Sequence, residues 1–304
     1  MEKKLTEQND SMAEERALKG KKLLKDQNLI DRYLFKKTIE NRDAYKAILE
    51  IIMGKEISLK DTPPIPEMEV GNSEILRSIR LDVVAEDADN SVFFTEMQKI
   101  KKNNLIKRSR FYSSQIDTTL LPAGDVNFNH LPDTCMILIA PFDLFDLGYY
   151  RYTFFNMSEE EPQIMLNDGT VRIFINTNGN NDEDFSEEFL AFMKYVTDSS
   201  EKVAYSVDSE RLKIIHKRVT EVRELETRGL EFMQYFEELA YAKEDGIEIG
   251  IEKGIGIGRQ EGLMQALAFI EKAQSLIDEN PMGIDELVNE GIPVEIAEFV
   301  LAKK

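Results

Sequence analysis

Tryptophan is missing from this sequence of 304 residues, and cysteine and histidine are scarce, with one and two copies. The lone cysteine, Cys135, excludes an internal disulfide and favours a reducing compartment, so we expect a cytoplasmic protein. One cysteine and two separate histidines also do not provide the ligand set of a zinc site.

Long apolar runs are missing as well. No stretch approaches the roughly 18 apolar residues that a membrane-spanning helix needs, so we expect no membrane partner. The first 22 residues are charged and polar and lack the apolar segment of a secretory signal. Hydrophobic residues nevertheless make up 42% of the chain, which is enough for a folded core.

Positively charged residues are fewer than negatively charged ones. The chain has 38 Lys and Arg residues and 57 Asp and Glu residues, for a formal net charge of −19. This balance argues against a protein that coats DNA nonspecifically, since its overall field repels phosphates. It does not exclude a nuclease, because metal ions and a local basic patch can carry the phosphate contacts.

The hydrophobic pattern divides the chain into a polar N-terminal segment at 1–25 with weak helix, a mixed α/β core at 26–200 and a helical C-terminal region at 201–304. Apolar residues at helical spacing predict two helices between Gln27 and Gly54, where the glycine ends the second helix. The proline-rich stretch Asp61–Met68 predicts an extended connector, because each proline restricts its own backbone and that of the residue before it.

Strands and one helix are expected in the rest of the core. Residues 78–100 predict a strand hairpin, and a helix is expected to follow at 103–120. The apolar run Thr134–Ala140 predicts a strand covered on both faces. The segments YRYTFF and VRIFIN predict two further strands, with a turn at Asn167–Gly169 before the second. The inner face of the helix is expected to consist of Leu105, Ile106, Tyr112 and Ile116.

Glycine recurs every four residues in the C-terminal region. The repeat consists of Gly246, Gly250, Gly254, Gly258 and Gly262. Each glycine inside a helix costs about 1 kcal/mol relative to alanine, and close approach of a second helix along the glycines is one reason to keep them. That interpretation predicts a homo-oligomer assembled through the C-terminal helices. A flexible linker and a strand are the open alternatives, the strand because isoleucines from 247 to 257 share odd positions.

Three polar residues interrupt the hairpin LDVVAEDADNSVFFTEMQKI where apolar residues are expected. Glu96 and Gln98 share a face because they lie two residues apart. Asp82 joins that face only if the numbers of each opposed pair sum to 178, which requires a three-residue loop at 88–90 or a bulge. A two-residue loop would pair Asp82 with Met97 and send Glu96 to the other face.

The shared face has two interpretations. Carboxylates on neighbouring strands can hold a hard divalent cation, and a bound cation can activate water for phosphodiester hydrolysis. The alternative is a strand that emerges into solvent and leaves Glu96 exposed. The face also carries Val92, Phe94 and Ile100, so it is not fully polar. The spacing of the three polar residues does not decide between the two interpretations.

A basic run free of acidic residues begins directly after Gln98. It consists of Lys99, Lys101, Lys102, Lys107, Arg108 and Arg110. In so acidic a protein this local excess favours contact with DNA phosphates. The alternative is an ordinary solvated helix start. Lysines near a helix N-terminus oppose the helix dipole, however, so helix stability does not explain them.

The layout resembles the PD-(D/E)XK nuclease superfamily and, within it, the recombination-promoting nuclease and transposase family. The hairpin carries the resemblance with its LDV strand and E-x-Q end, together with RSRFYSSQID, LIAPFDLF, YRYTFFN, LNDGTVRIFINTNG, the opening segment DRYLFKKTIENRDAYKAILEIIMGKEI and the glycine-spaced tail. The match covers about residues 28–265. It implies an α/β (α+β) restriction-endonuclease-like core, a mixed sheet flanked by helices, followed by an α-helical tail.

For the site, the resemblance implies that Asp82 and Glu96 bind Mg²⁺ or another divalent cation such as Mn²⁺. Gln98 stands where the superfamily usually has lysine, so it can donate a hydrogen bond but brings no positive charge. Asp31 and Glu40 are candidates for an additional acid. The implied function is a metal-dependent endonuclease that cleaves double-stranded DNA in recombination or mobile-element biology.

Two other functions compete with this one. The absent lysine and the acidic composition are compatible with a catalytically impaired family member that binds DNA or serves as an oligomeric scaffold. A third hypothesis lies outside nucleic-acid chemistry: an α/β scaffold whose tail mediates assembly.

Overall fold

The structure, a computed structural model, describes residues 15–61, 64–70 and 79–302. The chain divides into two compact units, Met1–Tyr235 and Phe236–Lys304. The expected core boundary at residue 200 lies inside the first unit. Ile215 and Val219, which follow that boundary, are fully buried in the core of this unit.

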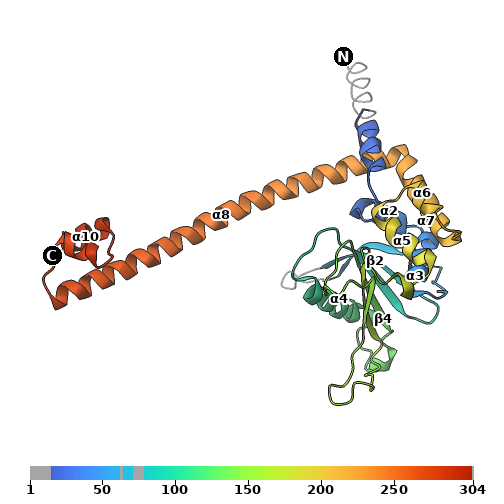
Figure 1. Cartoon of the computed structure of the whole chain (residues 1–304), viewed down its shortest axis with the longest axis horizontal. Helices are drawn as coiled ribbons and strands as arrows, with labels where there is room; N and C mark the ends of the chain where they lie inside the picture. Colours follow the sequence, from blue (N-terminus) through green and yellow to red (C-terminus); the bar gives the residue numbers. More distant parts are fainter. Residues whose placement is uncertain (1–14, 62–63, 71–78, 303–304) are drawn as a thin grey trace. The chain divides into compact units, whose positions relative to one another are not determined.

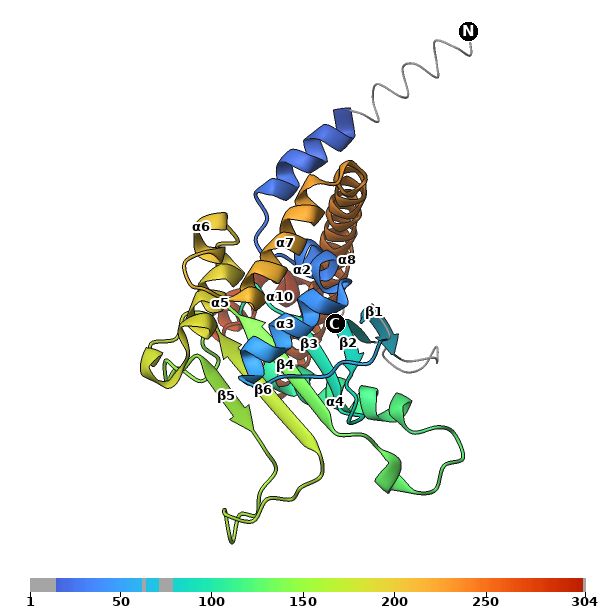
Figure 2. The same cartoon turned by 90° about the vertical axis from the view of Figure 1, so that its right-hand side faces the viewer.

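The described residues of the first unit contain a mixed sheet of six strands in the order β1-β2-β3-β4-β6-β5 (Figure 2). The strands are β1 Ile65–Val70, β2 Ile79–Glu86, β3 Val92–Met97, β4 Thr134–Ala140, β5 Arg151–Phe154 and β6 Thr170–Asn176. The three strands β3, β4 and β6 run parallel, and the other three pair antiparallel with their neighbours. Strand β4 is buried at every position, as its apolar run predicts.

Strand β1 corrects the expectation of a simple connector at Asp61–Met68. Ile65 lies opposite Val84 of β2, and Pro66 lies opposite Val83. Proline has no amide hydrogen for a strand ladder and is therefore confined mainly to edge strands. The position of β1 at the edge of the sheet makes Pro66 compatible with a strand. Residues 62 and 63 of the stretch lie outside the described part.

Helices cover both faces of the sheet (Figure 1). Besides a helix at residues 15–25, the described helices that lie wholly in the first unit and have eight or more residues are α2 Arg32–Ile39, α3 Arg42–Met53, α4 Leu105–Leu120, α5 Glu187–Thr197 and α7 Glu210–Glu224. Helix α4 packs on one face, and α2, α3, α5 and α7 pack on the other. Short helical segments connect them at α6 Glu201–Ala204, Phe128–His130 and Asp182–Asp184.

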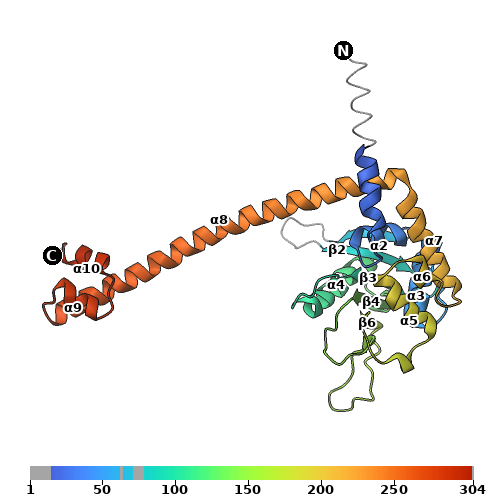
Figure 3. The same ribbon diagram turned by 45° about the horizontal axis from the view of Figure 1, so that its top comes forward.

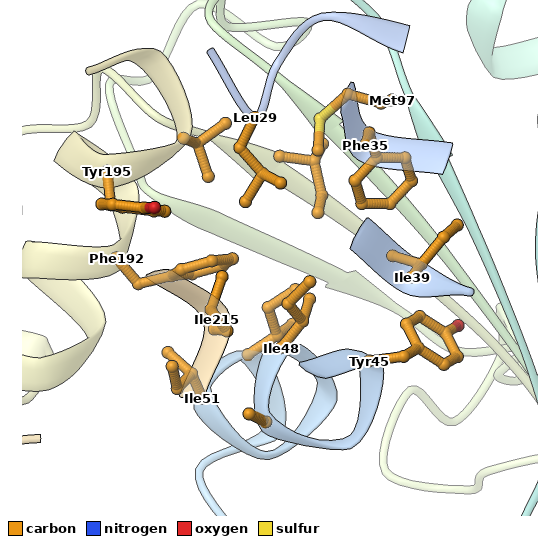
Figure 4. Close-up of a cluster of buried hydrophobic side chains, with 14 of the residues drawn as sticks. Leu29, Phe35, Ile39, Tyr45, Ile48, Ile51, Met97, Phe192, Tyr195 and Ile215 are labelled. Carbon is orange, nitrogen blue, oxygen red and sulfur yellow. The ribbon is translucent and has the colours of Figure 1, made fainter. Parts of the chain in front are cut away.

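The larger core lies on the face of the sheet opposite α4, between the strands and the helices α2, α3, α5 and α7 (Figure 4). Phe35 and Phe192 are fully buried there, and Met97 of β3 is buried in the same core. The Tyr45 hydroxyl and Thr95 Oγ1 lie 2.8 Å apart, so both buried polar atoms are hydrogen-bonded. Full burial of a large apolar side chain contributes about 1.5–3 kcal/mol, and this core therefore fixes the sheet against the helices.

Alternation along β3 assigns its residues to opposite faces. Phe93 and Met97 belong to the larger core, whereas Val92 and Phe94 belong to the core under α4. Side chains of a strand alternate with a period of two, so Glu96 lies on the α4 face. The sheet thus directs the candidate glutamate towards α4.

The two opening helices are confirmed, and local chemistry sets their ends. The Asn41 side chain accepts a hydrogen bond from the Ala44 amide at 2.9 Å and caps the start of α3. Gly54 ends this helix in the left-handed conformation, with φ of 68°. Both features follow directly from residue types that the sequence displays.

A further helix occupies residues 15–25, within the segment expected to be weakly helical. Leu24 is fully buried in the larger core. A Cβ atom on Gly20 would lie 2.0 Å from the carbonyl oxygen of Gly229, so two glycines meet where this helix crosses another. The residues before 15 lie outside the described part.

Helix α4 follows the predicted position but not the predicted inner face. Leu105 and Ile116 are buried as expected, whereas Ile106 is 46% exposed. Ser109 and Ser113 are buried instead. Their hydroxyls donate to backbone carbonyls of the same helix, at 2.8 and 3.2 Å, which satisfies them away from water.

The second unit is helical. Helix α8, Glu226–Glu279, begins ten residues before this unit and includes the whole glycine repeat, so the linker and strand alternatives are wrong. Its C-terminal end packs with α9 Ile284–Asn289 and α10 Val294–Leu301 (Figure 3). Ala273, Leu287 and Ala297 are fully buried in this small core. Among the described residues, no helix has the length and apolar character needed to cross a membrane.

Candidate active site

A three-residue loop joins β2 to β3, as the functional interpretation requires. The Asp87 amide donates to the Ser91 carbonyl at 2.9 Å, which closes the loop around residues 88–90. The Asp87 Oδ1 atom accepts from the amides of Asp89 and Ser91 at 3.0 and 2.8 Å. Asn90 adopts φ of 62°, the left-handed conformation that often completes such a loop.

This loop sets the register of the hairpin. Val83 lies opposite Thr95, and Val84 lies opposite Phe94, so the numbers of each opposed pair sum to 178. Continuing the register by one residue puts position 82 opposite Glu96. The alternative register, in which Asp82 opposes Met97, is therefore wrong. The Asp82 side chain lies outside the described part of the structure.

Glu96 and Gln98 are brought together on one face. Gln98 Nε2 donates to Glu96 Oε1 at 3.1 Å, and the Gln98 amide donates to the Ile139 carbonyl at 2.9 Å. Glu96 is only 5% exposed. A strand that emerges into solvent would expose this carboxylate, so the solvated-edge interpretation is wrong for Glu96.

Arg108 of α4 completes the environment of this carboxylate. Its Nη2 atom lies 3.1 Å from Glu96 Oε1, the oxygen that also accepts from Gln98. The guanidinium carbon lies 5.4 Å from the centre of the Tyr112 ring, within the range of a cation–π contact. The carboxylate is therefore buried against an amide and a permanent positive charge.

The remaining basic residues differ in their surroundings. Lys99 Nζ pairs with Asp31 Oδ1 at 2.6 Å, on the face opposite Glu96 as the strand period predicts. Lys101 Nζ donates to the Asp143 carbonyl at 2.7 Å and lies 3.3 Å from the Asp146 carboxylate. The other members of the run are exposed: Lys102, Lys107 and Arg110.

The two candidates for an additional acid are held by other partners. Asp31 accepts from the Asn28 amide at 2.8 Å besides its pairing with Lys99. Glu40 pairs with Lys37 at 2.9 Å and with Arg228 at 3.4 Å. The hydrogen bonds and ion pairs of the described residues bring neither acid into direct contact with Glu96.

Lys101 contacts a loop that the Asp143 side chain holds through hydrogen bonds. Asp143 Oδ2 accepts from the Tyr152 hydroxyl at 2.6 Å and from the Gly148 amide at 2.7 Å, and its Oδ1 accepts from the Phe145 amide at 2.8 Å. Burial raises the pKa of Asp143, but these hydrogen bonds outweigh burial and hold the pKa below its usual range. Asp143 is thereby a structural anion that shapes the loop.

The fit of these residues to a metal ion depends on the Asp82 carboxylate. Among the described side chains, no group of three or more His, Cys, Asp or Glu residues lies close enough together to hold an ion. The described side chains include Glu96 but not Asp82. The register puts position 82 opposite Glu96 on the adjacent strand. A pair of carboxylates so placed suits a cation that keeps several water ligands, as Mg²⁺ does.

Sequence reasoning did not identify the contact between Arg108 and Glu96. A signal was present, because Arg108 follows the buried Leu105 by three residues and so shares its side of the helix. The signal was missed because every member of the basic run, Arg108 included, was assigned to contact with DNA phosphates. The pairing also depends on which face of the sheet α4 covers.

A mixed sheet with helices on both faces, and an E-x-Q strand paired with the strand of Asp82, define a restriction-endonuclease-like α/β protein. Residues 28–247 match the family described as PD-(D/E)XK nuclease family transposase, and the chain belongs to this family. The expected family and fold class are thus confirmed. Comparisons with curated proteins and with solved structures gave no match.

Proposed function

We propose that the protein is a metal-dependent endonuclease that hydrolyses phosphodiester bonds of double-stranded DNA. The register of the β2–β3 hairpin carries the proposal, because it favours opposition of Asp82 and Glu96 on adjacent strands. These two carboxylates would hold Mg²⁺ or Mn²⁺. When bound, such a cation supplies an activated water and stabilises developing negative charge.

Gln98 has a positioning role in this proposal. Its amide nitrogen lies 3.1 Å from Glu96 Oε1, which holds the carboxylate in one orientation. An amide can also donate to water or to a phosphate oxygen. The family description supports a role in transposition or recombination. A cysteine content of one supports action in the reducing cytoplasm.

The cleavage assay tests this proposal with isosteric variants. We expect Mg²⁺-dependent cleavage of double-stranded DNA to fall by at least about 100-fold in Asp82→Asn and in Glu96→Gln, since each change removes a ligand charge from the cation. Asp89→Asn is the matched control, because Asp89 is an exposed acid in the loop of the same hairpin. Cleavage that persists in both site variants would contradict the assignment.

A catalytically impaired, DNA-binding member of the family is the second candidate. The observation that favours it is Gln98, which donates to Glu96 without contributing positive charge. The same assay separates the two functions. Binding of double-stranded DNA without cleavage in Mg²⁺ or Mn²⁺ would support the impaired protein and exclude the nuclease.

We further propose that the chain forms a homo-oligomer through α8. Cβ atoms built on Gly250, Gly254 and Gly258 would have nothing within 4 Å, so contacts inside the chain do not explain these glycines. The isoleucines of this segment are about half exposed; they are Ile247, Ile249, Ile251, Ile255 and Ile257. A second α8 packed along the glycines would cover apolar surface at close range.

A further inference from the structure

The candidate site lacks a lysine at position 98, but α4 places the positive charge of Arg108 beside Glu96. In phosphodiester hydrolysis a water oxygen bonds to phosphorus and the bond to the leaving oxygen breaks, with its electron pair going to that oxygen. The water releases a proton to solvent, and the leaving oxygen takes one up. The remaining phosphate oxygens carry the charge of the transition state, and a nearby cation stabilises it. Gln98 cannot supply that charge, whereas an arginine side chain such as that of Arg108 is positively charged.

We propose that Arg108 binds the phosphate under attack and supplies the charge that lysine would bring at position 98. This inference rests on the proposed nuclease function. Arg108 Nη2 is 3.1 Å from Glu96 Oε1, so the guanidinium lies beside the carboxylate proposed to hold the cation. One nitrogen contacts Glu96, and a guanidinium has five N–H donors in a fork that matches phosphate oxygens.

The fold holds Arg108 at this position. Leu105 and Ser109 are buried on the same side of α4 and fix that side against the sheet. The side chain of Arg108 is 22% exposed, so it is neither free in solvent nor closed off from a ligand. The ring of Tyr112 lies against the guanidinium, with 5.4 Å between its centre and Cζ.

Charge balance gives a second reason for the role. Glu96 is almost fully buried and accepts from Arg108 and Gln98 through a single oxygen. A buried carboxylate repels a DNA phosphate unless a cation offsets its charge. Arg108 offsets that charge before any metal binds. Once a metal ion shares the carboxylate, the guanidinium has donors for the phosphate.

Single-turnover cleavage in Mg²⁺ gives the first test. We expect Arg108→Gln to lower the cleavage rate by at least about 100-fold, the typical cost of losing one donor to a developing oxyanion. Arg108→Lys should recover at least tenfold of that loss, because it restores the charge. Lys217→Gln is the control, since Lys217 is exposed on α7, outside the basic run and on the other side of the sheet. Cleavage by Arg108→Gln at the parent rate would overturn the proposal.

Manganese affinity, measured by electron paramagnetic resonance without DNA, separates this role from simple support of Glu96. We expect Arg108→Gln to bind Mn²⁺ at least as tightly as the parent, because a competing cation has been removed. Loss of Mn²⁺ binding together with cleavage would overturn the proposal, since Arg108 would then only hold the ligand. Should the glutamine variant fail to fold, Arg108→Met keeps the stem over Tyr112 and is measured instead.

DNA binding with Ca²⁺ in place of Mg²⁺, so that a cation shares the carboxylate, keeps the inference separate from the proposed nuclease function. We expect Arg108→Gln to reduce the slope of log affinity against log salt by about 0.9, the value for one neutralised phosphate, and Arg108→Lys to retain it. An unchanged slope in Arg108→Gln would overturn the proposal. A parent protein that never cleaves DNA would contradict the nuclease function alone, and the slope would still decide the role of Arg108.

Discussion

Glu50 is a buried acid that joins two helices far apart in the chain. Its Oε2 accepts from Arg211 Nε at 2.8 Å, and its Oε1 accepts from the Ile57 amide at 2.9 Å. Burial raises the pKa of Glu50, but the hydrogen bonds from Arg211 and Ile57 and the charge of Lys46 outweigh it and hold the pKa below its usual range. The ionised form is therefore the one that the fold stabilises.

The lowered pKa predicts the direction of one pH effect. A folded pKa below the unfolded value adds stability above the unfolded pKa, which is about 4.3 for glutamate, and this stability is lost as the pH falls through the folded pKa. We expect Glu50→Gln to be less stable than the parent at neutral pH and to lose less stability on acidification. Urea unfolding across the acid range measures both effects.

The exposed neighbour Glu56 provides the control. Glu56→Gln should keep the acid dependence of the parent protein. A Glu50→Gln variant whose unfolding free energy falls with acid as steeply as that of the parent would contradict the assignment.

Among single residues, the hairpin was the most predictable. A shift of the strand pairing by one residue moves every side chain of a strand to the other face. Asp82 and Glu96 can therefore share a face only with a three-residue loop or a bulge. The observed loop around residues 88–90 meets that condition. Arg108 was less predictable, because its contact depends on how α4 docks on the sheet. The two strands of a hairpin are close in sequence, whereas α4 and most of the strands it covers are not.

At the scale of elements, two misjudged segments share a physical cause. Considered alone, Pro66 predicts a break in regular structure, because proline has no backbone N–H to donate. Strand β1 lies at the edge of the sheet, however, where that N–H is not required for pairing. Ser109 and Ser113 indicate a solvated helix face, but their hydroxyls bond to the backbone of α4 and allow burial. In both cases tertiary position overrides local preference.

Helix α8 gives the prediction at this scale. We expect the triple change Gly250→Ala, Gly254→Ala and Gly258→Ala to lower the mass of the full-length protein in light scattering, because Cβ atoms would separate the paired helices. Within one chain the same changes should favour the helix by about 1 kcal/mol each. Circular dichroism should therefore show no loss of helix while the mass falls.

A matched substitution on the same helix controls for this effect. Gly256 lies off the four-residue repeat, and a Cβ atom there would also have nothing within 4 Å. Gly256→Ala should keep the parent mass. If the triple variant also keeps the parent mass, α8 is not the seam that we propose.

The whole molecule combines a strongly acidic composition with a basic run on one short segment. The formal net charge is −19, so attraction to DNA must come from local charge. Lys102, Lys107 and Arg110 are the exposed members of the run. The whole-molecule charge and the local charge thus make opposite predictions for DNA binding.

The salt dependence of DNA binding distinguishes them. We expect the combined change Lys102→Gln, Lys107→Gln and Arg110→Gln to reduce the slope of log affinity against log salt by up to about 2.7, or 0.9 for each phosphate that the variant no longer neutralises. The measurement is made in EDTA by fluorescence anisotropy on duplex DNA.

A second triple variant controls for net charge. It replaces exposed lysines of α5, α6 and α7 on the other side of the sheet by glutamine: Lys194, Lys202 and Lys217. We expect its slope to match that of the parent. Equal slopes for both triple variants would contradict a phosphate-binding role for the basic run.

The central claim is that Asp82 and Glu96 hold one divalent cation between adjacent strands. Anomalous diffraction from crystals soaked in Mn²⁺ tests it most directly, because the signal locates the metal independently of activity. We predict one peak between the two carboxylates, with both as ligands, and no peak at this place in Glu96→Gln. A peak bound elsewhere, or an Asp82 side chain that points away from Glu96, would contradict the account.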